Sequence, residues 1–218
     1  MNVRRRSLIL QICCLLFCAW PSSLDAQLGS TFHDVAVNYK YPSTYRNIRE
    51  VDFRNLPVYY FQRNSNPSYA FPLKSGKYTA TSQSEGEEVS LNSVHPLKES
   101  GADQYALAIY GWDSEAGSSG QVGIAQLFEL SGGRLQIVQQ IDWDWHYGGL
   151  YERFAKLFDD KAAILTFPSA HYLDGDAHCC VSAIDIVEMR WNGRRFIRSA
   201  TRTELSDYGR REGKRLPQ

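Results

Sequence analysis

Apolar and polar residues alternate along most of the chain, and turn signals interrupt this alternation about every 8 to 14 residues. A period of two places successive side chains on opposite faces of a strand, which is typical of antiparallel sheets. We therefore expect a mainly β protein, either an antiparallel sandwich or a strongly bent sheet, with at most one or two short helices.

Residues 105–110 (Tyr-Ala-Leu-Ala-Ile-Tyr) are apolar at every position, in contrast to the alternating segments. This pattern predicts a central strand that is covered on both faces. The apolar residues at 150, 154, 157 and 158 have helical spacing, so one short helix is expected there.

Two hairpins are expected from glycine-containing turns. Ser131-Gly132-Gly133 predicts a turn into the strand that begins near Leu135. Asn192-Gly193 predicts a two-residue type I′ turn, because both residue types tolerate a positive φ. That register pairs Met189 with Phe196 and Trp191 with Arg194.

The first 26 residues predict a signal peptide rather than a part of the fold. Arg4, Arg5 and Arg6 precede an apolar run from 8 to 20, and cleavage is expected after Ala26. Arg5-Arg6 also fits a twin-arginine signal, although paired arginines are common in general secretory signals, which we favour. We expect a secreted or periplasmic protein with a single mainly β domain over 27–205, of which 27–55 is an irregular lead-in. Residues 206–218 are expected to be a disordered basic tail.

Charge and cysteine content limit the classes of function. The full chain has 24 basic and 24 acidic residues, and removal of residues 1–26 takes away three arginines and one aspartate. No basic excess remains, which argues against a general nucleic-acid or membrane-surface binder. No transmembrane span is expected after cleavage. Only Cys179 and Cys180 remain as thiols, and an oxidising compartment favours a vicinal disulfide between them, with reduced thiols or an intermolecular bridge as alternatives.

The segment from Asp142 to Tyr147 carries the most chemistry. Alternation along a strand gives this segment an acidic face and an aromatic face. The acidic face carries Asp142, Asp144 and His146, and the aromatic face carries Trp143, Trp145 and Tyr147. We interpret the aromatic face as core, continuous with Leu135, Ile137 and Ile141, and the acidic face as solvated. The alternatives are a metal or acid–base site on the acidic face, and a sugar-stacking platform on the aromatic face.

A second cluster surrounds an Asp-Gly-Asp sequence. Its potential metal ligands are His171, Asp174, Asp176 and His178, next to the two cysteines. The spacing matches neither a calcium loop nor a zinc motif, and a plain Asp-Gly turn before a strand explains the carboxylates. His33 and His95 have no acidic or thiol neighbours in the sequence.

The stretch Gly-Asp-Ala-His-Cys-Cys-Val-Ser-Ala at 175–183, followed by Met-Arg-Trp-Asn-Gly-Arg-Arg-Phe at 189–196, resembles a group of uncharacterised exported bacterial proteins. In that group a Cys-Cys step precedes a strand that ends in an aromatic-Asn/Asp-Gly-x-x-Phe turn. The resemblance covers about residues 100–200. It implies a bacterial source and export, and it brings no activity and no functional residue.

These features favour an exported, non-catalytic binding or envelope-associated module. Its partner is expected to be an envelope polymer, a small ligand or another protein, and no cofactor and no nucleic acid are expected. The alternative is a hydrolase or metal-dependent enzyme that uses Asp142, Asp144 and His146 with His171 and Asp176. A purely structural part of an envelope assembly is the third hypothesis.

Overall fold

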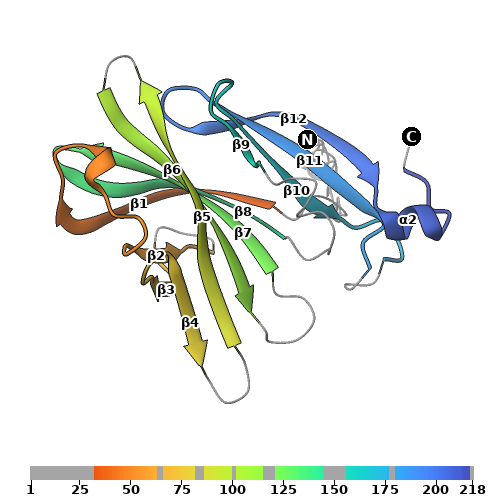
Figure 1. The fold of residues 1–218 in the computed structure, drawn as a ribbon. Helices are drawn as coiled ribbons and strands as arrows, with labels where there is room; N and C mark the ends of the chain where they lie inside the picture. Colours follow the sequence, from red (N-terminus) through yellow and green to blue (C-terminus); the bar gives the residue numbers. More distant parts are fainter. Residues whose placement is uncertain are drawn as a thin grey trace, which may run out of the picture.

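The computed structural model describes residues 32–62, 66–81, 86–99, 102–114, 121–144, 156–176 and 180–216. As predicted, these residues form a mainly antiparallel β fold, with two sheets, a β-hairpin and one short α-helix (Figure 1). The larger sheet has, from edge to edge, β1 (Phe32–Thr44), β8 (Arg134–Asp144), β7 (Gln121–Ser131), β6 (Ala102–Ser114), β5 (Gly86–Glu99) and β4 (Lys77–Thr81). The smaller sheet has β12 (Phe196–Leu205), β11 (Ala183–Trp191), β10 (Ile164–His171) and β9 (Phe158–Asp159). The hairpin is β2 (Pro57–Tyr60) with β3 (Tyr69–Pro72), and the helices are the 3-10 turn η1 (Ile48–Glu50) and α2 (Asp207–Arg211).

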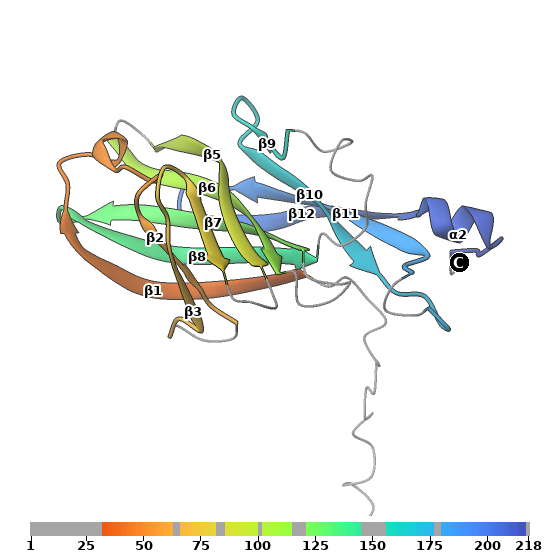
Figure 2. The same ribbon diagram turned by 60° about the horizontal axis from the view of Figure 1, so that its bottom comes forward.

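The larger sheet is strongly curled and has a separate apolar core on each face (Figure 2). The β2–β3 hairpin and the η1 segment cover one face, and the core there, which we name the hairpin core, includes Val58, Phe61 and Phe128. The smaller sheet packs on the opposite face around the inter-sheet core, which includes Trp143, Phe167 and Phe196. The fold therefore has three layers of strands, with the curled sheet in the middle.

The strand predicted at 105–110 is confirmed as the buried part of β6. Tyr105, Leu107 and Ile109 pack in the inter-sheet core. Ala106, Ala108 and Tyr110 pack in the hairpin core. This explains why the segment is apolar at every position, since neither face reaches solvent.

Strand β8 changes its orientation halfway along. Leu127 of β7 lies opposite Gln139, and Phe128 lies opposite Ile137, so Val138 is an additional residue in β8. A bulge of one residue reverses the faces of all residues that follow it. Leu135 and Ile137 thus point into the hairpin core, whereas Ile141 and Trp143 point into the inter-sheet core. Our prediction of one continuous apolar face from Leu135 to Trp143 was wrong for this reason.

Of the two expected hairpins, the first is confirmed and the second has a different register. Gly132 and Gly133 have φ of 57° and 78° and connect β7 to β8 as a two-residue turn. In the second hairpin Trp191 pairs with Phe196, so the turn has four residues instead of two. The Asn192 side chain explains the longer turn, because its Oδ1 accepts hydrogen bonds from the backbone N–H groups of residues 194 and 195.

Both ends of the domain are more regular than the sequence predicts. The lead-in contains β1, which pairs with β8 and turns Val35, Val37, Tyr39 and Tyr41 toward the hairpin core in a period of two. The expected basic tail contains α2, whose N-cap is Ser206. Ser206 Oγ donates to the carbonyl of Val181 and accepts from the N–H of Gly209, which fixes the helix without apolar anchors. Most of the helix expected near 150–158 lies outside the described residues, and Phe158 belongs to β9.

Candidate functional site

Asp142 is buried on the hairpin-core side of β8, and our prediction of a solvated acidic face is wrong for this residue. It is 3% exposed because the bulge at Val138 turns it toward the hairpin. Its Oδ1 lies 2.9 Å from Nδ1 of His33, and its Oδ2 accepts from Nε2 of Gln140 at 3.0 Å. Burial and the Asp142 carboxylate, which also accepts from the Tyr60 hydroxyl, raise the pKa of Tyr60 well above its usual value.

Trp143 has no surface for a ligand. It is 0% exposed and stacks on Phe167 with ring centroids 4.5 Å apart. The interpretation of this residue as core is confirmed, and a sugar-stacking role for it is excluded. Asp144, at the end of β8, is half-buried, and Trp145, His146 and Tyr147 lie outside the described residues.

His171 belongs to a polar cluster on the smaller sheet. Its Nδ1 lies 3.1 Å from Oδ2 of Asp185, whose Oδ1 accepts from Oγ1 of Thr203 at 2.6 Å. His171 follows Phe167 by four residues in β10, so both share the face that meets Trp143. Asp142 is on the other face of β8. The structure therefore does not bring Asp142 and His171 together as the hydrolase hypothesis requires.

Asp176 stabilises a turn, which supports the plain interpretation of the Asp-Gly-Asp sequence. Its Oδ2 accepts from the backbone N–H groups of Leu173 and Ser182, both at 2.9 Å. Burial opposes ionisation, but these bonds, together with one from the Ser182 hydroxyl and with Lys214 Nζ 3.5 Å away, hold the pKa of Asp176 below its usual value. Asp174 is exposed.

The described part of the chain contains no group of three or more His, Cys, Asp or Glu side chains that could hold a metal ion. His178 and Cys179 lie outside the described residues. The vicinal disulfide between Cys179 and Cys180 therefore stays a prediction.

Histidine–aspartate pairs are the feature that sequence reasoning missed. His33, His95 and His171 each place Nδ1 next to an aspartate, at 2.9, 2.8 and 3.1 Å. The partners of His33 and His95 are 109 and 65 residues away in the chain, so no local pattern indicates them. The three pairs lie on different strands of the fold, and His95 has a second contact, from its Nε2 to Oγ of Ser93 at 2.9 Å.

An aromatic patch lies where the β2–β3 hairpin meets the edge of the larger sheet. We define it by five residues: Tyr69, Tyr78 and Trp112 at the surface, and the buried rings of Tyr60 and Phe71 that they contact. Tyr69 is 46% exposed, and its ring is parallel to that of Phe71 (10°) and 5.4 Å from that of Trp112. Trp112 is half-buried and donates from Nε1 to Oε1 of Glu87 at 2.9 Å. Among the described residues, the large hydrophobic side chains that are exposed are Tyr69 and Ile197.

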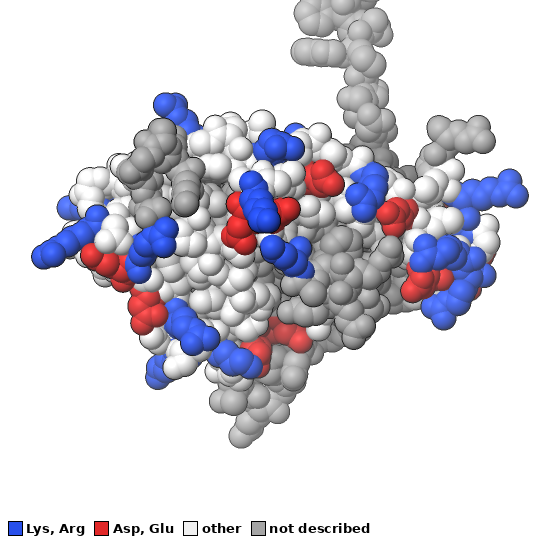
Figure 3. Space-filling view, turned by 45° about the horizontal axis from the view of Figure 1, so that its top comes forward, with Lys and Arg blue, Asp and Glu red and all other residues white. Residues whose placement is uncertain are grey.

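Charged side chains of both signs mix on the face shown in Figure 3. This agrees with the balanced composition of the chain. Across the residues that the structure describes, no helix combines the length and apolar character required to cross a membrane.

Comparison with known proteins adds no assignment. No protein-family model matches the chain, and neither the curated proteins nor the solved structures include a match.

Proposed function

We propose that this chain is an exported binding module that holds a polysaccharide of the cell envelope on its aromatic patch. The observation that carries the proposal is Tyr69: its ring is half exposed, yet Phe71 and Trp112 pack against it. An aromatic ring that is fixed before binding loses little conformational entropy when a ligand stacks on it.

A sugar ring suits this patch better than a purely apolar ligand. Aromatic faces stack on the C–H face of a sugar, and the phenol of Tyr69 and the carboxylate of Glu87 supply hydrogen-bonding groups for its hydroxyls. Glu87 already fixes the indole of Trp112 through Nε1. The patch therefore combines an apolar surface with polar groups at its margin, as binding sites for small ligands do.

Export is the other part of the proposal, and it is supported by the basic, apolar and small-residue segments that end at Ala26. Expression of the full chain in a bacterium, followed by fractionation and N-terminal sequencing, tests it. We expect mature protein that starts at Gln27 outside the cytoplasm. Uncleaved protein in the cytoplasm would contradict export and leave the binding experiment unaffected.

Binding is tested by sedimentation of the purified protein with insoluble peptidoglycan and by calorimetry with soluble fragments of it. We expect Tyr69→Ala to lower the affinity at least tenfold, which corresponds to about 1.4 kcal/mol. Ile197→Ala is the matched control, because Ile197 is 44% exposed but lies on β12. Equal binding by both variants, or no binding by the unmodified protein, would refute the proposal.

A further inference from the structure

Ser93, His95 and Asp160 form a chain of contacts where the two sheets meet. Ser93 and His95 lie on β5, and Asp160 follows β9, whose strand is next to β5 in Figure 2. Ser93 Oγ lies 2.9 Å from Nε2 of His95, and Nδ1 of His95 lies 2.8 Å from Oδ1 of Asp160. Both distances fall within hydrogen-bonding range.

The direction of these hydrogen bonds follows from the chemistry of the three groups. An ionised carboxylate only accepts, so the proton of the neutral His95 ring is on Nδ1 and points to Asp160. Nε2 then carries a lone pair, and the Ser93 hydroxyl must donate to it. This is the order of groups that activates a serine nucleophile: a hydroxyl, a base, and a carboxylate that sets the tautomer of the base.

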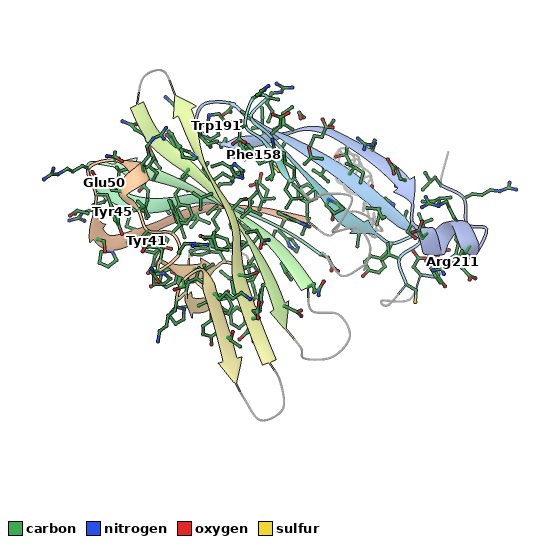
Figure 4. The ribbon with its side chains drawn as sticks, viewed as in Figure 1. Tyr41, Tyr45, Glu50, Phe158, Trp191 and Arg211 are labelled. Carbon is green, nitrogen blue, oxygen red and sulfur yellow. The ribbon has the colours of Figure 1, made fainter. Side chains whose placement is uncertain are left out.

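The surroundings hold the His95 ring in place and leave Ser93 partly exposed. The His95 side chain is 18% exposed and packs on the ring of Phe158 (labelled in Figure 4) at 4.8 Å between centroids. Ser93 is half-buried. Lys156 Nζ lies 4.0 Å from the other oxygen of Asp160, which keeps a positive charge beside the ionised carboxylate.

The backbone of β5 is unpaired on one edge near Ser93 among the described residues. In the described part of the chain, β4 pairs with β5 only as far as Ser90, and beyond Leu91 the strand pairs with β6 alone. The free edge of a strand presents backbone N–H groups, which are the donors that stabilise an oxyanion.

We propose that Ser93 is a nucleophile toward carboxylic esters, with His95 as its general base and Asp160 as the positioning residue. Ser93 Oγ bonds to the ester carbonyl carbon while its proton moves to Nε2 of His95. The tetrahedral adduct then expels the alcohol, which takes that proton. Water, deprotonated by His95, releases the acid and restores Ser93. This activity goes beyond the proposed binding function, which uses neither Ser93 nor His95.

A fluorophosphonate probe tests the nucleophile directly. The serine oxygen displaces fluoride from phosphorus, and the covalent adduct is measured by intact mass and located by peptide mapping. We expect one adduct, on Ser93, and none on Ser93→Ala. Ser90→Ala is the matched control, since Ser90 is half-buried on the same strand and its Oγ faces Asn92 instead of a histidine. It should label at the unmodified rate.

His95 and Asp160 are tested by the rate of labelling and by NMR. His95→Gln should slow labelling at least about 100-fold, the lower end of general-base catalysis. Long-range ¹⁵N–¹H spectra should show the Nδ1–H tautomer of His95 in the unmodified protein. Asp160→Asn should lower the population of this tautomer, and Asp160→Glu should preserve the population. The proposal is overturned if the unmodified protein gives no adduct or an adduct on another residue, which peptide mapping shows without any variant. It is also overturned if His95→Gln labels at the unmodified rate.

Discussion

The side-chain amide of Gln139 pairs with the backbone of Phe196 as a neighbouring strand would. Gln139 Nε2 donates to the carbonyl of Phe196 at 2.9 Å, and its Oε1 accepts from the N–H of Phe196 at 2.8 Å. Gln140 does the same with Phe61 on the opposite face of β8, at 2.8 and 3.2 Å. Two consecutive glutamines thus attach the middle layer to the strand layers on both sides.

Loss of either pair should be costly, because a buried backbone N–H and C=O are left without partners. We expect Gln139→Leu to lower the free energy of unfolding by about 2–6 kcal/mol, from a penalty of about 1–3 kcal/mol for each of the two unsatisfied groups. Urea denaturation measures it. Gln136→Leu is the control: Gln136 is half-buried on the same strand and donates to Glu129, so its loss should cost less than about 1 kcal/mol. Equal effects of the two variants would contradict the role of Gln139.

Gly123 and Gly111 face each other in β7 and β6, and they should respond differently to alanine. A Cβ on Gly123 would lie 2.2 Å from the ring of Trp143, which is stacked on Phe167 and has no free space. A Cβ on Gly111 would meet its neighbours at 3.5 Å, an ordinary contact. We expect Gly123→Ala to cost roughly 3 kcal/mol, the upper range for overpacking, and Gly111→Ala to change stability by less than about 1 kcal/mol.

A double-mutant cycle separates the clash from other effects of the glycine. Trp143→Ala should cost about 3–5 kcal/mol alone, as for a buried aromatic residue. If the Trp143 ring is the obstacle, adding Gly123→Ala to Trp143→Ala should cost much less than Gly123→Ala does in the unmodified protein. Strict additivity would show that the obstacle lies elsewhere.

The elements that the sequence predicts well are those determined by neighbouring residues. The apolar segment at 105–110, the Gly132-Gly133 turn and the turn at Asp174–Asp176 each depend on local composition and backbone preferences. The fold class follows from the same alternation, because a period of two in burial is seen in β1, β4 and the first half of β8.

What the sequence does not reveal depends on single residues or on distant partners. One additional residue, Val138, reverses the second half of β8, and alternation has no marker for it. The His33–Asp142 and His95–Asp160 contacts join segments that only the completed sheets bring together. Helix α2 is fixed by the cap at Ser206 and by the close approach of Gly209 to the Ser182 carbonyl, so a search for apolar anchors overlooks it.

The burial of Asp142 changes the expected effect of mutating it. Asp142→Asn replaces an acceptor oxygen with a donor that faces Gln140 Nε2 or the His33 ring, so it should cost about 1–3 kcal/mol. Asp113→Asn is the control, since Asp113 is exposed and bonds only to the Gln121 amide among its described contacts, and it should stay within about 0.5 kcal/mol. Thermal or urea unfolding of both variants decides. If Asp142→Asn leaves the free energy of unfolding unchanged, the face of β8 that carries Asp142 is solvated.

Buried tyrosines should make the protein sensitive to alkali. Burial raises the pKa of Tyr41 and Tyr110 well above 10, and burial together with a hydrogen bond to Tyr59 raises that of Tyr39 to about 12. In the unfolded chain these phenols lose their protons near pH 10. Between pH 10 and 12 the folded state therefore binds more protons than the unfolded state, and stability falls as the pH rises through this range. Below about pH 9 these groups have no effect on stability, because both states are protonated.

Urea unfolding at pH 9 and pH 11, with phenolate absorbance at 295 nm, measures the loss of stability. Tyr110→Phe removes one titrating group, so it should reduce the slope of stability against pH by up to one proton. Early phenolate absorbance at pH 11 from every tyrosine of the folded protein would contradict this prediction.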